Sequence, residues 1–193
     1  MSVVLLAAAL AGALLPERPA WSRLRGGDGP GPSESLTPYT HFRQRPAAED
    51  PPSLYHLVRR ACDRHGDLRA FSYLPAPGAP GGSRVDVTYA AFADLVMRVA
   101  RSLWALGVRK GSRVMILGSN SVEWAALVYA THALGGVYSA MYPQAKPSEW
   151  AYVVRDARPA VLVVDDPAQL EDLRRAAGRG EGSLPRMSVV CTG

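Results

Sequence analysis

Hydrophobic residues recur along the chain from Ser53 onward at spacings that predict helices and strands in alternation. Ser53 precedes an apolar pattern of helical period that stops at Gly66, which predicts a helix. Its expected buried face comprises Leu54, Leu57, Val58, Ala61 and Cys62. Residues 69–74 and 84–88 resemble short strands, and the proline- and glycine-rich segment between them predicts a hairpin loop. The domain therefore opens with a helix and a hairpin.

Thr88 is placed to cap a long amphipathic helix over residues 89–106 that stops at Gly107. Its expected buried face comprises Phe92, Leu95, Val96, Val99, Leu103 and Leu106. Further strands are predicted over 113–117, 137–141, 160–164 and 187–191, and further helices over 121–134, 148–157 and 167–177. Continuous apolar strands separated by helices indicate parallel pairing with right-handed crossovers. The predicted fold class is α/β, a doubly wound, mostly parallel sheet with helices on both faces.

The first 52 residues have a different character. Residues 3–15 form an unbroken run of 13 apolar and small residues, closed by Pro16. As a helix, this run would reach about 20 Å, which is short of a hydrocarbon core of roughly 30 Å. It is similar to the hydrophobic region of a signal peptide but lacks the preceding positive charge. We expect residues 1–15 to act as a targeting segment or weak membrane anchor, the alternative being an N-terminus without such a role.

Residues 16–52 hold eight Pro and four Gly, a composition typical of a flexible linker. The predicted organisation is thus an anchor-like segment over 1–15, a linker over 16–52 and an α/β domain over 53–193. A membrane-associated or organellar location is favoured over a cytoplasmic one.

Composition narrows the classes of function. The chain has 193 residues, 48% of them hydrophobic, and a formal net charge of +5. No apolar run approaches the roughly 20 residues of a membrane-spanning helix, so a multi-pass membrane protein is excluded. The basic residues are nearly all arginines scattered among acids, whereas nucleic-acid binding needs clustered charge, so no nucleic-acid partner is expected. Cys62 and Cys191 lie far apart in apolar segments and are expected to be reduced, buried thiols.

Candidate chemistry is sought beyond the carboxyl ends of the strands, where parallel sheets bind ligands. The relevant loops are 118–120, 142–146 and 165–166. The first enters a helix, whose N-terminus favours anions. It has one glycine where the dinucleotide fingerprint needs three and the P-loop needs two and a lysine, so a structural turn is favoured over a phosphate contact. Asp165 and Asp166 are expected to end a strand and begin the next helix, with a favourable dipole interaction.

The remaining candidates are interpreted as structural. The glycine-rich segment 178–183 follows a helix and predicts a surface loop. The histidines are too dispersed for a metal site, and His132 is expected to pack within a helix. Lys110 and Lys146 are expected to be solvated. No nucleophile and base occur at a supporting spacing, so the residues by themselves assign no catalytic, cofactor-binding or metal-binding position.

Five short motifs then occur in a family's order and spacing. They are VTYAAF at 87–92, ALGVRKGSRV at 105–114, SNSVEW at 119–124, ALGGVY at 133–138 with MYP at 141–143, and EWAYVV at 149–154 followed by VD at 164–165. This series resembles the N-terminal domain of the adenylate-forming (AMP-binding) synthetases, over residues 53–193. Within that family, ILGSNS at 116–121 and LPRM at 184–187 are most similar to long-chain fatty acyl-CoA synthetases of the bubblegum type.

The resemblance implies the first subdomain of a two-step ligase that uses ATP, Mg²⁺ and CoA to activate a fatty acid. The family's Thr-Ser-Gly-Thr-Thr-Gly-x-Pro-Lys loop, its Tyr-Gly-x-Thr-Glu and Thr-Gly-Asp motifs and its C-terminal catalytic Lys do not occur in these 193 residues. The matched motifs are mainly scaffold in the family: Gly135 and Gly136 allow tight helix-to-strand packing, and Asn120 and Ser121 cap a helix. We therefore expect the N-terminal part of a fatty acid–CoA ligase, inactive alone and without tight binding of ATP, Mg²⁺ or CoA. The alternative is a non-catalytic interaction or regulatory module derived from that fold.

Overall fold

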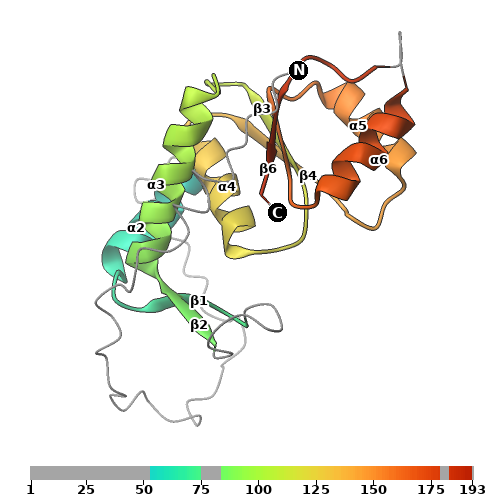
Figure 1. Ribbon diagram of the computed structural model, residues 1–193. Helices are drawn as coiled ribbons and strands as arrows, with labels where there is room; N and C mark the ends of the chain where they lie inside the picture. The colour runs from blue at the N-terminus through green and yellow to red at the C-terminus, as the bar shows by residue number, and fades with distance from the viewer. Residues whose placement is uncertain (1–52, 75–83, 179–182, 193) are drawn as a thin grey trace, which may run out of the picture.

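The computed structural model describes residues 53–74, 84–178 and 183–192. In this part of the chain, helices lie on both sides of a parallel sheet, and a two-stranded ribbon stands apart from it (Figure 1). The elements are α2 Leu54–Arg64, β1 Arg69–Tyr73, β2 Val85–Thr88, α3 Tyr89–Ala105, β3 Arg113–Leu117, α4 Val122–Ala133, β4 Val137–Met141, α5 Pro147–Ala157, β5 Val161–Val164, α6 Pro167–Ala177 and β6 Ser188–Cys191. Each predicted element is present. The predictions for residues 1–52 and 75–83, and for most of the loop 178–183, lie outside the described residues.

The four-stranded sheet has the order β4-β3-β5-β6, and all of its pairs are parallel. From β3 the chain therefore extends the sheet first on one side, with β4, and then on the other, with β5 and β6. Leu117 at the end of β3 pairs with Met141 of β4 and Val164 of β5, so the carboxyl ends of these strands are aligned. The sheet is doubly wound and parallel, as predicted.

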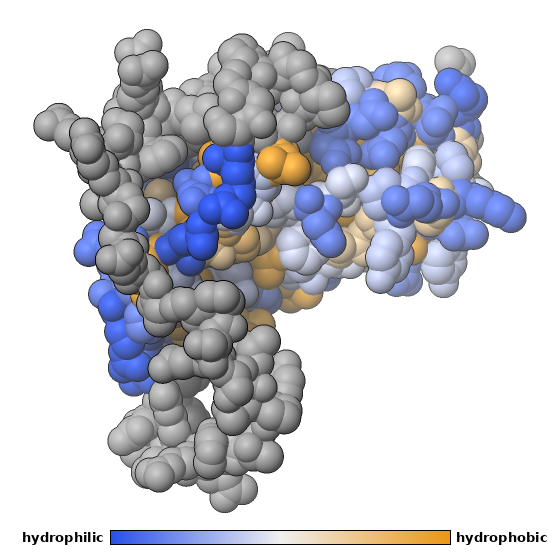
Figure 2. Space-filling model, turned by 90° about the horizontal axis from the view of Figure 1, so that it is seen from below, coloured by the Kyte–Doolittle hydropathy of each residue, from blue (hydrophilic) through white to orange (hydrophobic). Residues whose placement is uncertain are grey.

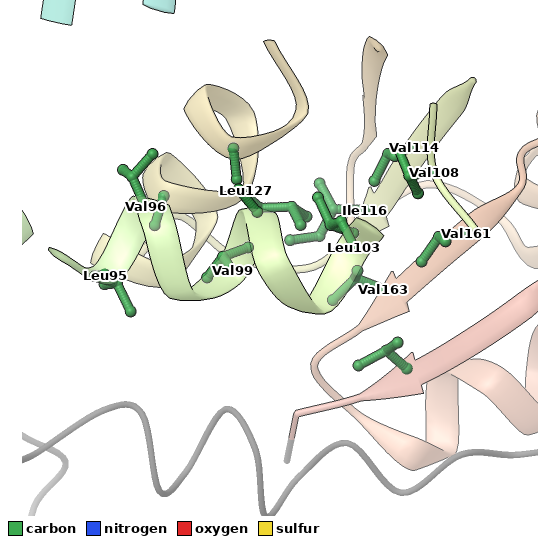
Figure 3. Close-up of a cluster of buried hydrophobic side chains, with 14 of the residues drawn as sticks. Leu95, Val96, Val99, Leu103, Val108, Val114, Ile116, Leu127, Val161 and Val163 are labelled. Atoms are coloured by element: carbon green, nitrogen blue, oxygen red, sulfur yellow. The ribbon is translucent and has the colours of Figure 1, made fainter. Parts of the chain in front are cut away.

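Alternate strand residues enter two separate cores. On one face, Val114, Ile116 and Val163 pack with α2, α3 and α4 (Figure 3). On the other face, Met115, Leu162 and their neighbours pack with α5 and α6. The central strands are continuous apolar runs because helices bury both faces of the sheet.

Helix α2 buries only part of the face predicted for it: Val58 and Cys62 lie toward the core, but Leu54 and Leu57 do not. Tyr55 and Val58 pack against the core and Cys62 is buried in it, whereas Leu54 and Leu57 are 55% and 51% exposed. The exposed and the core-facing apolar residues both recur at helical spacing, so the helical periodicity of the sequence could not distinguish between them. The contacts of α2 with α3 and α4 decide the choice.

The ribbon confirms the predicted hairpin, because β1 and β2 pair antiparallel. Among the described helices, none combines the length and hydrophobicity that crossing a membrane requires.

Candidate functional site

The carboxyl edge of the parallel sheet brings together the three loops singled out from the sequence. Residues 118–120 follow β3, 142–146 follow β4 and 165–166 follow β5. Figure 2 views the molecule from this end and shows hydrophobic side chains in the middle of the face, flanked by hydrophilic ones. The loops therefore surround a partly apolar surface.

The turn after β3 is held by an internal carboxylate. The backbone N–H of Ser119 donates to Oδ2 of Asp165 across 2.7 Å. A Cβ at Gly118 would lie 2.8 Å from the same oxygen, so glycine is needed for the carboxylate to approach the turn. Because Asp165 already occupies this amide, the geometry favours a structural turn over a phosphate contact.

Helix caps complete the turns after β3 and β5. The Ser121 hydroxyl accepts a hydrogen bond from the Trp124 N–H at 3.0 Å, which begins α4. Asp166 accepts from the Ala168 N–H at 2.8 Å and begins α6, as expected. Asp165 instead accepts the Ser119 N–H, a role that the local sequence does not indicate because this partner lies 46 residues away.

The loop after β4 is fixed by Trp150. The indole N–H of this buried residue donates to the carbonyl of Tyr142 at 2.9 Å, while the Tyr142 side chain is 82% exposed. A cleft of about 440 Å³ with a mixed polar and apolar lining separates this loop from the turn after β3. Its lining comprises Gly118, Ser119, Asn120, Trp124, Ala140, Met141, Tyr142, Pro143 and Gln144.

A second, largely apolar pocket of about 200 Å³ shares Ser119 and Trp124 with the cleft. It lies between the sheet and helices α3 and α4. Its lining comprises Val99, Ser102, Leu103, Leu106, Ile116, Ser119, Ser121, Glu123, Trp124, Leu127, Val163, Asp165, Val190 and Thr192. The apolar surface at this end of the molecule thus continues inward as a pocket.

The Gly135–Gly136 pair joins α4 to β4 closely. Gly135 has φ +69°, and a Cβ at Gly136 would lie 3.0 Å from the Ser112 carbonyl oxygen and 2.9 Å from Cγ2 of Thr131. The Gly136 N–H also donates to the Thr131 carbonyl at 2.9 Å. This is the tight helix-to-strand packing expected of the pair.

The Tyr138 phenol and the two cysteine thiols lie in packed parts of the domain. Burial raises the pKa of the Tyr138 phenol, whose ring packs edge-to-face on Trp124. Burial likewise raises the pKa of the Cys62 thiol. Both cysteines are free thiols, as expected, but Cys191 is only half-buried because β6 is an edge strand.

The remaining candidates from the sequence, two lysines and a histidine, do not join a common site. Lys110 and Lys146 are exposed, as expected, and His132 is half-buried on α4. In the described residues, no group of three or more His, Cys, Asp or Glu side chains could hold a metal ion.

Comparison with known proteins shows which family has this sequence and fold. The sequence profile described as "AMP-binding enzyme" matches residues 58–189. The long-chain-fatty-acid–CoA ligase ACSBG2 of Mus musculus is 29% identical over 129 residues, which cover 66% of this chain and 18% of the mouse protein. The ligase ACSBG1 of Homo sapiens is 28% identical over 127 residues, covering 64% of this chain and 16% of the human protein. The chain therefore spans less than a fifth of the length of these curated relatives.

Solved structures of acyl-CoA ligases have a similar fold. The fatty acyl CoA synthetase of Mycobacterium tuberculosis superposes with a TM-score of 0.59 at 27% identity, over 71% of this chain and 26% of that one. A long-chain-fatty-acid-CoA ligase from Archaeoglobus fulgidus gives a TM-score of 0.61 at 20% identity, over 75% of this chain and 28% of that one. The second likeness supports the fold alone.

Proposed function

Because the chain belongs to the family of AMP-binding enzymes, we propose that it forms the first α/β subdomain of an ATP-dependent long-chain fatty acid–CoA ligase. The family match over residues 58–189, which takes in most of the described domain, carries this proposal. The substrate class rests on the curated relatives, which are long-chain-fatty-acid–CoA ligases of the bubblegum type.

The proposed reaction has two steps. The fatty carboxylate attacks the α-phosphate of ATP to give an acyl-adenylate and pyrophosphate, and the thiol of CoA then displaces AMP. Mg²⁺ would neutralise the phosphate charge that develops in the first step. The described residues contribute the scaffold of this enzyme, and no catalytic step is assigned to any of them.

We further propose that the 193-residue polypeptide does not adenylate a carboxylate by itself. The absence of the Ser/Thr/Gly-rich loop with its lysine from this sequence supports the proposal, as does the carboxylate of Asp165 in the turn after β3. The test is carboxylate-dependent exchange of labelled pyrophosphate into ATP with the purified chain. We expect no exchange above background, and clear exchange with a long-chain fatty acid would contradict the proposal.

A chimera tests the scaffold role directly. Residues 58–189 replace the corresponding region of the mouse ACSBG2 ligase, and acyl-CoA formation from ATP, CoA and a long-chain fatty acid is measured. We expect activity above that of the same chimera carrying Gly136→Val, in which the helix-to-strand packing is blocked. A chimera that is folded by circular dichroism yet inactive would contradict the scaffold role and favour the non-catalytic module.

Residues 1–15 are proposed to associate weakly with membranes, in keeping with a hydrophobic acyl substrate. The support is the apolar run over residues 3–15. A fluorescent protein fused to residues 1–52 should sediment partly with membranes, and the double variant Leu5→Glu, Leu6→Glu should not. Equal distribution of the two fusions would contradict this proposal.

A further inference from the structure

The proposed ligase function assigns no ligand to the apolar pocket beside Trp124. Val99 and Leu103 of α3 form one wall, beside Ile116 and Val163 of the sheet (Figure 3). The pocket volume of about 200 Å³ can be compared with cavities of about 150 Å³ that take up benzene. It therefore has room for a hydrocarbon group of about six carbons.

The polar part of the lining carries negative charge. Ser119, Asp165 and Thr192 follow the carboxyl ends of β3, β5 and β6, and Glu123 lies in the first turn of α4. The lining contains two carboxylates and no arginine, lysine or histidine. A ligand carboxylate is repelled here, whereas a cation is attracted.

We propose that this pocket binds a primary ammonium that carries a short hydrocarbon group. The hydrocarbon lies between α3 and the sheet, where it is removed from water. The ammonium lies at the rim near Glu123 and Asp165, and its three N–H donors match the carboxylate and hydroxyl acceptors there. This proposal does not depend on the proposed function.

Ligands with one hydrocarbon chain and different head groups test the proposal. Hexylammonium, 1-hexanol and hexanoate are titrated into the 193-residue protein at pH 7, with binding followed by calorimetry and by amide chemical shifts. We expect hexylammonium to bind at least about tenfold more tightly than hexanoate, with 1-hexanol between them, and added salt to weaken hexylammonium alone. Hexanoate binding as tightly as hexylammonium, or no saturable binding of hexylammonium, would overturn the proposal.

Matched variants locate the charge. Glu123→Gln removes one rim carboxylate and keeps its shape, so the Kd of hexylammonium should rise about three- to tenfold while that of 1-hexanol stays the same. Glu149→Gln makes the same change in the first turn of α5, outside the pocket lining, and should leave both unchanged. Equal effects of the two variants would indicate unspecific charge attraction and overturn the site.

A second pair locates the hydrocarbon. Ser102→Leu adds an isobutyl group at a position that lines the pocket, and Ala91→Leu introduces the same side chain at an exposed position of α3. Binding of hexylammonium should be lost in the first variant and kept in the second, both being folded by circular dichroism. Undiminished binding to folded Ser102→Leu would refute the pocket as the binding site.

Discussion

Replacing Gly136 by alanine should destabilise the domain more than the addition of one methyl group suggests. The added Cβ would lie 2.9 Å from Cγ2 of Thr131 and 3.0 Å from the carbonyl oxygen of Ser112. The second neighbour is backbone, so it cannot be relieved by rotating a side chain. Thr131 belongs to α4 and Ser112 directly precedes β3, and the Val137 N–H at the start of β4 donates to the same Ser112 oxygen at 2.8 Å.

The expected cost follows from these contacts. Overpacking of a close contact costs about 1–3 kcal/mol. Weakening the backbone hydrogen bonds at Ser112 and Thr131 adds about 1 kcal/mol. The reduced freedom of the unfolded chain with alanine returns about 0.4–1 kcal/mol. The free energy of unfolding should therefore fall by about 1–3.5 kcal/mol, a large part of the roughly 5–15 kcal/mol typical of a domain.

Urea unfolding followed by far-ultraviolet circular dichroism measures this change. Gly66→Ala is the matched control, because a Cβ there would meet its neighbours at ordinary contact distances of 3.5 Å and 3.7 Å. The control should change stability by no more than about 1 kcal/mol, in the stabilising direction. If Gly136→Ala unfolds at the same urea concentration as the control, with an equal slope, the argument from close packing is wrong.

Three further predictions concern single side chains. Ser121→Ala removes the α4 cap and should lower the free energy of unfolding by about 1 kcal/mol in the same urea assay, whereas Ser121→Asn should retain most of it. The hydrogen bond from Ser72 and the nearby arginines lower the pKa of Asp86, so its contribution to stability is present above its unfolded pKa and is lost as pH falls through the lower folded value. Carboxyl NMR should show Asp86 titrating below a free aspartate, and Ser72→Ala should raise that pKa; an unchanged value contradicts the assignment. At pH 8, Cys191 should react with a thiol reagent before Cys62, which is buried and has a raised thiol pKa; the reverse order, read by mass spectrometry, would contradict the burial.

Much of the fold follows from local pattern. The apolar runs of β3 and β5 have no polar alternation, which is possible only where both faces of a sheet are covered, so helices on both sides could be predicted. Ser53, Thr88 and Ser121 each accept a hydrogen bond from the first turn of a helix, and cap chemistry of this kind is visible in the sequence. The parallel order then placed the three candidate loops at one edge of the sheet.

The candidate site was less accessible from the sequence. The pocket draws its lining from α3, α4, β3, β5 and β6 and the turns that follow the strands, so no single segment carries its signature. Asp165 was assigned to the dipole of the following helix, yet its carboxylate bonds to the amide of Ser119. Two residues this far apart meet only once β3 and β5 are paired.

By itself, the sequence determined the elements, their parallel pairing and the family, because helical and strand periods, caps and turn glycines act over a few residues. The tertiary structure alone decided that α2 leaves Leu54 and Leu57 exposed, although both belong to its apolar pattern. It also decided that Asp165 occupies the turn after β3 and that two carboxylates border an apolar pocket. These outcomes depend on how the elements dock, and docking is governed by contacts between residues far apart in the chain.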